Sequence, residues 1–483
     1  MRKSFLMVVM VFICILSSGI VLAGPVKSGI VIMSADGQPP VRLEEQALVE
    51  QYRIMLPVAV IKDYLYEDVY LANNRLMVNL GLPKFRLETE KLDDLIYAGV
   101  ELNFPVKKIG GKPYIDFYGL DKLFGVAVTY QADTQTVRIM TGQNSFFAPL
   151  KLSERRKKQA FAGKINLVWD HITGEARNLA PAAKIPGLDV LSPTWFSIVS
   201  HDGLVASKAD LKYVRDAHDK GYKVWALVSN SFDRDLTRAV LNNEWTRRKV
   251  IKQLAVYSSL YQLDGINIDF ENIYDDDKDK LTQFVRELTA VLKEQNSVVS
   301  IDITVPSSAS SWSLCYDRAA LGQIVDYVMV MTYDEHWRTS PVSGSVASQG
   351  WVEQGIAATL QSIPGEKLLM GLPFYTREWE ETSENGKITV KPRTLSMAQA
   401  QQLVQESGVS PVWLQDKGQY YAEYRKAGRT YRIWLEDERS IALKASLAGK
   451  YQLAGVAVWR KDFEQPAVWD VLHTALKKTA KHH

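Results

Sequence analysis

We predict an α/β fold: a small N-terminal α/β domain, then a (β/α)8 barrel that carries an α+β insertion before its last strand. The first reason is that apolar, strand-like runs alternate with amphipathic helical stretches over about 300 residues. The second is that one of these runs carries polar residues at every second position. The third is that the gap before the last run is too long for one helix.

Eight runs are expected to form the strands of the barrel. They are Lys164–Trp169, Val190–Phe196, Lys223–Val228, Gly265–Glu271, Val299–Val305, Tyr327–Thr332, Leu368–Leu372 and Gly455–Trp459. The helical stretches between them are the crossovers that parallel strands need. We place the barrel domain at 162–476 and the insertion at about 376–452, where segments rich in Tyr and Arg replace a single helix.

The composition is that of a globular protein. Of 483 residues, 46% are hydrophobic and 23% are charged, which excludes a disordered, collagen-like or polytopic membrane protein. The net charge of +3 offers no electrostatic reason to expect a nucleic acid partner. We expect a monomer.

The N-terminus has the order of a secretory signal. Arg2 and Lys3 precede an apolar run from Phe5 to Leu16, which is followed by Ser17-Ser18-Gly19 and then by Val21-Leu22-Ala23. We expect a signal peptide at 1–23 and a secreted or cell-surface bacterial protein; an uncleaved membrane anchor is the alternative. Cleavage would leave Cys315 as the one cysteine, so that no internal disulfide could form.

Two further segments precede the barrel. A flexible lead is expected at 24–40, and a basic linker at 146–161. Between them, 41–145 contains a weak internal echo, because each half reads as strand, short helix and hairpin. This domain resembles the small domain named after the N-terminal region of copper amine oxidases, which implies a wall-associating module. A structural spacer is the alternative, and no metal is implied, since no His precedes His171.

The fourth run reads Asp-Gly-Ile-Asn-Ile-Asp-Phe-Glu from Asp264 to Glu271. Because side chains alternate along a strand, Asn267, Asp269 and Glu271 share one face, and apolar residues share the other. In a barrel the apolar face meets the helices, so the polar residues point inward, where carboxylates are costly without compensation. An edge strand with one wetted face is the alternative. Glu271 would lie at the C-terminal mouth, where barrel enzymes carry out their chemistry.

These residues resemble the D-x-x-D-x-D-x-E signature of glycoside hydrolase family 18. Other strand ends agree: Met331-Thr332-Tyr333-Asp334 is similar to the sixth-strand M-x-Y-D, and Gly371-Leu372-Pro373-Phe374-Tyr375 to the seventh. Trp459 falls where the family has a Trp at the eighth strand. The resemblance covers about residues 160–475 and is closest to bacterial cell-wall and spore-cortex glucosaminidases.

The resemblance implies a role for each residue. Glu271 would be the general acid, and the 2-acetamido oxygen of the substrate would be the nucleophile, an exception to the two-carboxylate scheme. Asp269 would orient the acetamido group and raise the pKa of Glu271, and Tyr333 would bind the acetamido carbonyl. The expected substrate-binding residues are Asn267, Asp334, Trp459, Tyr375 and Trp169.

Position 267 departs from the signature, since many members carry Asp there. Asn267 could donate a hydrogen bond to Asp269 but could not take up a titrating proton. Asp264 falls on the helix-facing side of the strand, so a turn or structural role is favoured for it.

No metal or cofactor is expected. The seven His show no zinc-binding spacing, and the acidic run Asp275–Asp279 is interpreted as a helix start, with calcium as the alternative. We expect an exported hydrolase of N-acetylglucosamine-containing glycans, with peptidoglycan as the favoured substrate. Chitin or chitooligosaccharides, and a non-catalytic glycan-binding barrel, are the alternatives.

Overall fold

The computed structural model describes residues 26–35, 38–50, 53–80, 100–142, 157, 159–174, 178–384 and 387–477. The expected signal peptide at 1–23 and most of the expected linker at 146–161 lie outside these ranges. Among the described residues, no helix is long and apolar enough to cross a membrane.

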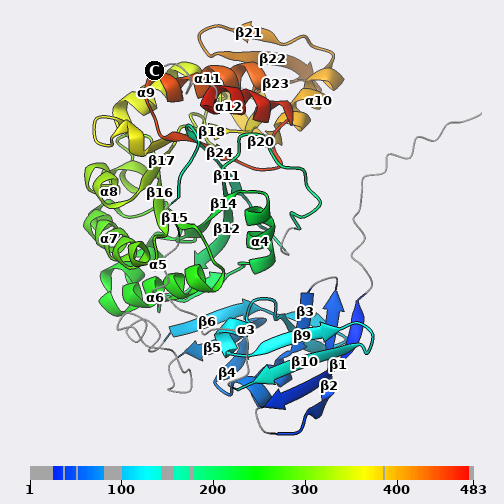
Figure 1. The fold of residues 1–483 in the computed structure, drawn as a ribbon. Coiled ribbons are helices and arrows are strands. Elements are labelled where there is room, and N and C mark those ends of the chain that lie inside the picture. Colours follow the sequence, from blue (N-terminus) through cyan, green and yellow to red (C-terminus); the bar gives the residue numbers. More distant parts are fainter. Residues whose placement is uncertain are drawn as a thin grey trace, which may run out of the picture.

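A closed parallel barrel forms the larger part of the protein (Figure 1). Its strands are β11 (Ile165–Asp170), β12 (Val190–Ile198), β14 (Lys223–Ser229), β15 (Gly265–Asp269), β16 (Val298–Thr304), β17 (Tyr327–Met331), β18 (Leu368–Pro373) and β24 (Gly455–Trp459). The strand β11 pairs with both β12 and β24, which closes the sheet. Each of the eight expected runs forms one of these strands, so the fold prediction is confirmed.

Helices surround the barrel (Figure 1). They are α4 (Leu211–Asp219), α5 (Arg234–Asn242), α6 (Glu244–Leu260), α7 (Lys278–Glu294), α8 (Arg318–Ile324), α9 (Gln349–Thr359), α11 (Glu438–Lys450) and α12 (Ala467–Lys477). Several begin at residues that favour helix starts: Asp210, Asp233 and Asn243 accept hydrogen bonds from the first free backbone N–H groups of α4, α5 and α6.

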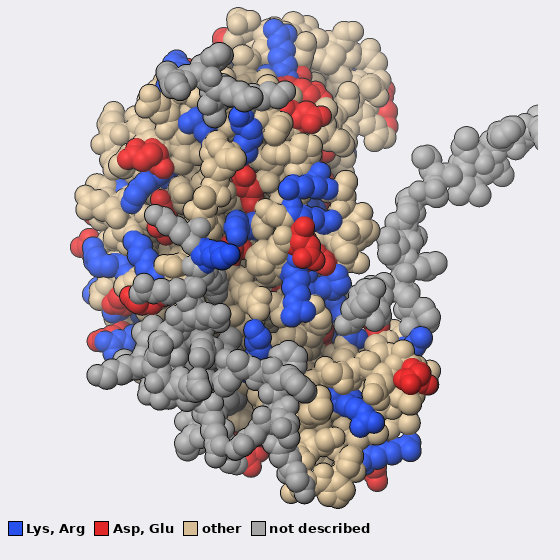
Figure 2. All heavy atoms as spheres, in the orientation of Figure 1, with Lys and Arg blue, Asp and Glu red and all other residues tan. Residues whose placement is uncertain are grey.

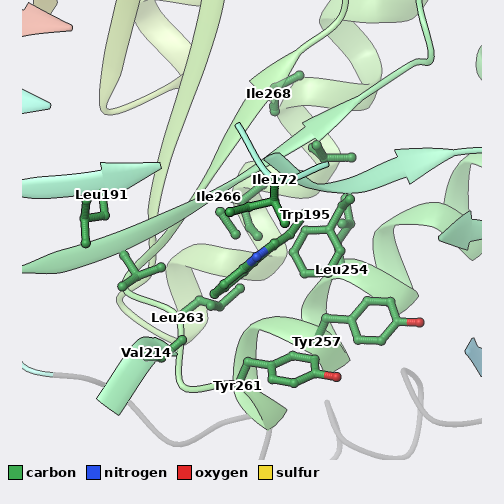
Figure 3. Close-up of a cluster of buried hydrophobic side chains, with 14 of the residues drawn as sticks. Ile172, Leu191, Trp195, Val214, Leu254, Tyr257, Tyr261, Leu263, Ile266 and Ile268 are labelled. Atoms are coloured by element: carbon green, nitrogen blue, oxygen red, sulfur yellow. The ribbon is translucent and has the colours of Figure 1, made fainter. Parts of the chain in front are cut away.

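The two faces of β15 meet different surroundings, as the alternation of its residues predicts. Ile266 and Ile268 point outward into an apolar layer that includes Leu254 and Tyr257 of α6 (Figure 3). Phe270 continues this file and stacks on Phe284 of α7, with ring centroids 5.2 Å apart. The opposite face therefore points into the barrel, where Asn267 and Asp269 are buried.

The insertion is a sheet with one helix. Its strands are β19 (Tyr375–Glu384), β20 (Lys387–Ser396), β21 (Val412–Leu414), β22 (Gln419–Lys426) and β23 (Arg429–Leu435), and its helix is α10 (Met397–Ser407). We expected it to extend to about residue 452. It ends instead with β23, because α11 packs against α9, α12 and the barrel strands β18 and β24.

The N-terminal domain consists of two sheets with short helices. Its strands are β1 (Lys27–Ala35), β2 (Val41–Glu50), β3 (Arg53–Pro57), β4 (Val69–Ala72), β5 (Arg75–Leu80), β6 (Val100–Pro105), β7 (Lys107–Ile109), β8 (Lys112–Asp116), β9 (Ala127–Gln131) and β10 (Thr136–Thr141). Its helical turns are α1 (Val58–Val60), η1 (Ile61–Leu65) and α3 (Asp121–Phe124). The order strand, short helix, hairpin occurs twice, in β3 to β5 and in β8 to β10. The expectation of a flexible lead at 24–40 is wrong for β1, which pairs with β2 and β10, so this domain begins before residue 41.

The N-terminal domain packs directly on the barrel domain through β6 (Figure 1). Asn103 of β6 donates from Nδ2 to the carbonyl of Val205 at 2.6 Å, and its Oδ1 accepts from the N–H of Ser207 at 3.4 Å. Both partners belong to the short strand β13 (Val205–Ser207), which pairs with β12. The amide of Asn103 thus satisfies backbone groups of a barrel-domain strand in a fully buried position.

Aromatic and charged contacts reinforce this interface. The hydroxyl of Tyr257 on α6 accepts from the N–H of Asn103 at 2.9 Å, and its ring meets Phe104 edge-on. Arg53 forms ion pairs with Asp116 of its own domain and with Asp210, the first residue before α4. One apolar cluster includes buried residues of both domains. The domain is therefore an integral packing partner of the barrel.

The end of the expected linker closes the bottom of the barrel. Gln159 accepts from the indole N–H of Trp225 at 2.9 Å and donates to the carbonyl of Asp264 at 2.6 Å. Phe161 packs edge-on against Trp225. The N-terminal ends of the strands are thus covered, whereas the C-terminal ends form the opposite mouth.

Charge is mixed over the surface that Figure 2 shows. Lys and Arg side chains alternate with Asp and Glu side chains on this face, without a large area of one sign. This distribution agrees with the near-balance of 58 basic and 55 acidic residues in the whole chain.

Replacing Asn103 by Ala tests the interface. The variant leaves the carbonyl of Val205 and the N–H of Ser207 without their partner, and each unpaired buried group costs about 1–3 kcal/mol. We expect a lower free energy of unfolding, measured by urea denaturation, in one transition that includes both domains.

Ser28→Ala is the matched control, because it removes an exposed hydrogen bond to Gln46 within the N-terminal domain. It should change the unfolding free energy by less than about 0.5 kcal/mol. Two separate transitions, of which Asn103→Ala moves the N-terminal one alone, would contradict an integral interface.

Candidate active site

The polar file of β15 ends at the C-terminal mouth of the barrel. Asp269 is the last residue of the strand and is 8% exposed. Glu271 lies two residues further along the chain and is partly buried. Tyr333 and Asp334 come just after β17, and Trp459 ends β24. The structure therefore gathers the residues that the sequence singled out at the same end of the barrel.

The acids of β15 influence one another. Burial raises the pKa of Asp269 to about 7. Burial also raises the pKa of Glu271 well above its usual range, and the negative charges of Asp269 and Asp334 add to this effect. Both effects favour the protonated form of Glu271, which is the form that a general acid needs.

Three hydrogen bonds hold the backbone around Glu271. Asn230, just after β14, accepts from the N–H of Glu271 at 3.1 Å and donates to its carbonyl at 2.7 Å. Asn230 also donates to Thr237 at 2.8 Å, and Tyr316 donates to the carbonyl of Phe270 at 2.8 Å. The turn that presents the Glu271 side chain is thus fixed from two neighbouring loops.

Asn267 makes a different contact from the one expected. Its Nδ2 donates to Oδ2 of Asp302 at 2.7 Å, and its Oδ1 accepts from the hydroxyl of Ser300 at 2.7 Å. Both partners lie on the neighbouring strand β16, so the fully buried amide joins β15 to β16 rather than to Asp269.

Aromatic rings surround the acids. The ring of Tyr333 lies edge-on to Trp169 at 6.4 Å between centroids, and to Tyr375 at 6.2 Å. Trp169 also lies 6.1 Å from Trp459, which is partly exposed. Trp169 itself is 1% exposed, so it supports Trp459 and Tyr333 from below rather than offering a free surface.

Asp334 is held by residues of the insertion. Tyr375 donates its hydroxyl to Asp334, and Arg377 forms an ion pair with the same carboxylate at 2.9 Å. Arg377 also donates to the carbonyl of His336 at 3.0 Å. The first strand of the insertion therefore orients the loop that follows β17, and half of the Asp334 side chain stays accessible.

Asp264 lies at the other end of the strand. It pairs with His218 at 2.6 Å and accepts from the N–H of Val224 at 2.9 Å, which fits the structural role favoured from the sequence. In the acidic run, Asp277 pairs with Arg238 at 2.7 Å, just before α7. Within the described residues, no group of three or more His, Cys, Asp or Glu is placed to hold a metal ion.

Three residues of this site were not singled out from the sequence: Asn230, Asp302 and Arg377. Asp302 carried a signal, because Ser300, Asp302 and Thr304 alternate with apolar residues on the fifth run as the polar file does on the fourth. Asn230 and Arg377 carried none, since their partners come from other strands.

Known proteins resemble this chain over the barrel. The family model described as Glycosyl hydrolases family 18 matches residues 176–464. The chain is 27% identical to the uncharacterized glycosylase YvbX of Bacillus subtilis (strain 168), over 57% of this chain and 81% of that protein. It is 27% identical to the cortical fragment-lytic enzyme of the same organism, over 52% of this chain and 60% of that protein.

A solved structure has the same fold. The chitinase of Chromobacterium violaceum ATCC 12472 matches with a TM-score of 0.58 and 23% identity, over 65% of this chain and 98% of that one. This likeness concerns the fold alone. The family model covers more than half of the chain, and the chain therefore belongs to glycosyl hydrolase family 18.

Proposed function

We propose that this enzyme is an exported hydrolase of N-acetylglucosamine-containing glycans, and that peptidoglycan is its substrate. The observation that carries the proposal is the position of Glu271 at the mouth of the barrel, where burial and two neighbouring carboxylates raise its pKa and favour its protonated form. A glycosidic bond breaks when an acid protonates the leaving oxygen and a second group stabilises the positive anomeric centre.

Glu271 supplies the proton in this proposal. Asn230 accepts from the N–H of Glu271 and donates to its carbonyl, which fixes the backbone that carries this side chain. A fixed acid with a raised pKa fits general acid catalysis near neutral pH, because it holds its proton until the leaving oxygen needs it.

The acetamido oxygen of the sugar acts as the nucleophile. A protein nucleophile would have to be an ionised carboxylate facing the anomeric carbon. Asp269 suits that task poorly, since it is 8% exposed and still belongs to the strand β15 inside the barrel. In our proposal Asp269 instead binds the acetamido N–H, and the hydroxyl of Tyr333 donates to the acetamido carbonyl as it attacks.

The remaining side chains hold the sugar ring. Trp459 provides an apolar surface beneath it, and the accessible half of Asp334 accepts from sugar hydroxyls. Tyr375 and Arg377 orient Asp334, so the insertion contributes to substrate binding through this carboxylate.

Peptidoglycan is favoured by two arguments. One of the relatives is a cortical fragment-lytic enzyme, and the chain begins with the order of a secretory signal. We further propose that the N-terminal domain is of the copper amine oxidase-N type and associates with the cell wall. It stays packed on the barrel in doing so, because Asn103 and Arg53 join the two domains.

Product analysis tests this function. Purified sacculi and chitooligosaccharides are incubated with the enzyme, and the soluble fragments are reduced and analysed by mass spectrometry. We expect release of muropeptides with N-acetylglucosamine at the reducing end, because the proposal places N-acetylglucosamine as the sugar whose own 2-acetamido group attacks the anomeric carbon.

The other outcomes decide between the alternatives. If the enzyme cleaved chitooligosaccharides but left the sacculi intact, it would be a chitinase. Binding of either glycan without any cleavage would make it a glycan-binding barrel and would contradict the role of Glu271.

Replacing Glu271 by Gln tests the acid. Gln keeps the size and hydrogen bonding of the side chain but has no transferable proton, so turnover should fall by about 10²–10⁴-fold. Oligosaccharide binding, measured by calorimetry, should persist. In the wild type, turnover should decline at alkaline pH as Glu271 loses its proton.

Glu287→Gln is the matched control, because Glu287 lies on the outer helix α7 and pairs with Arg247 at 2.8 Å. It should retain wild-type turnover. If Glu271→Gln also kept near-wild-type turnover, Glu271 would not be the acid.

A further inference from the structure

Asp302 is a buried carboxyl that the proposed mechanism leaves without a role. It lies in β16, is 1% exposed and accepts a hydrogen bond from Asn267 at 2.7 Å. In the described part of the chain, no Lys or Arg forms an ion pair with Asp302 or Asp269. Burying a carboxyl group without a neighbouring cation costs folding free energy. Its presence here therefore indicates a functional role.

The strand register places Asp302 beside Asp269. In the parallel pair β15–β16, Asn267 lies opposite Ser300 and Ile268 opposite Ile301. One further step along both strands brings Asp269 opposite Asp302. Since both residues continue the inward-facing files of their strands, their carboxyl groups are neighbours inside the barrel.

Two adjacent buried carboxyl groups hold a proton between them more readily than two charges. Burial and the charge of Asp269 raise the pKa of Asp302 well above its usual range, whereas burial raises that of Asp269 to about 7. The two carboxyl groups therefore titrate as a pair, in which the negative charge of one favours the protonated form of the other.

Asn267 fixes this arrangement without taking part in the titration. Ser300 donates to its amide oxygen, which turns the amide N–H toward Asp302. At this position many members of the family have Asp, which could share a proton with Asp269. The chain thus has an amide where that carboxyl would stand and a carboxyl on the next strand.

We propose that Asp302 is a positioning residue that supplies the second carboxyl of the catalytic network in place of an acid at position 267. Asp302 and Asp269 share one proton, so the pair carries a single negative charge. The shared proton holds the carboxyl group of Asp269 in place for the acetamido group of the sugar. The inference rests on the proposed role of Asp269 but can be tested without turnover.

Other titratable or polar groups face the pair from neighbouring elements. They are Glu271 after β15, Trp169 of β11, Tyr316 before α8 and Tyr333 after β17. The amide of Asn267 and the indole of Trp169 oppose the rise in the pKa of Asp302, whereas Glu271 adds to it. The tyrosines stay neutral, since burial raises both of their pKa values.

The first test measures turnover against pH. Asp302→Asn keeps the shape and neutrality of a protonated Asp but removes its proton. We expect kcat to fall about 10- to 100-fold with KM within about threefold. The alkaline limb of the kcat/KM profile should move to lower pH by about one unit. The reason is that the remaining acids lose their protons more easily when the second carboxyl, with its negative charge, is absent.

The double variant Asn267→Asp/Asp302→Asn returns a second carboxyl to β15. It should recover at least part of kcat and move the alkaline limb back toward the wild-type pH. Asp326→Asn is the control, since Asp326 binds the N–H of Val299 at the opposite end of the barrel. It should leave the pH profile unchanged. An unshifted limb in Asp302→Asn, or no recovery in the double variant, would overturn the proposal.

The second test reads the proton directly. Infrared spectra of protein labelled with ¹³C at the Asp carboxyl groups are recorded from pH 5 to 9, in the Glu271→Gln background. We expect a protonated Asp band that persists above pH 8 and that disappears when Asp302→Asn is added. Absence of this band in the Glu271→Gln protein would overturn the proposal. Since no substrate is involved, failure of the proposed function leaves this result intact.

Discussion

Burial of acids at the mouth of the barrel is the constraint on which the candidate site depends. Asp269, Glu271 and Asp302 all have raised pKa values because of burial, and the negative charge of Asp269 adds to the rise in Glu271 and Asp302. This arrangement lowers stability. Folding raises the pKa of Asp269 from 3.8 to about 7, so its contribution to stability is full below pH 3.8 and is lost as the pH rises through 7. The proposed acid catalysis therefore depends on protonated carboxyl groups whose burial lowers the stability of the fold.

The surrounding structure offsets that loss by holding the site rigidly. Ile266 and Ile268 of β15 pack in the apolar layer that includes α6 (Figure 3), and Phe270 stacks on Phe284 of α7. Asn230 fixes the peptide of Glu271, and the insertion fixes Asp334 through Tyr375 and Arg377. The N-terminal domain adds a buried contact to α6 through the hydroxyl of Tyr257. Elements far apart in the sequence thus restrain a small number of side chains.

The sequence predicted the eight strands because period-two patterns and apolar runs are local signals, and it predicted Asp269, Glu271 and Tyr333 as candidates because they end such strands. It could not predict the contact from Asn267 to Asp302. That contact depends on the register between β15 and β16, which the spacing along one strand does not contain. The insertion boundary near 452 was placed too late for a similar reason, because only packing assigns α11 to the barrel.

Inhibition by a thiazoline analogue of N-acetylglucosamine tests the central claim most directly, because this compound mimics the cyclised acetamido intermediate. The account predicts competitive inhibition of the wild type and weaker binding to Tyr333→Phe, which lacks the hydroxyl that contacts the acetamido oxygen. Binding is compared by calorimetry, and mechanism-based fluoro-sugars are tested in parallel with mass spectrometry of the protein. Absence of thiazoline inhibition, together with a fluoro-sugar covalently trapped on Asp269 or another carboxylate, would contradict substrate assistance.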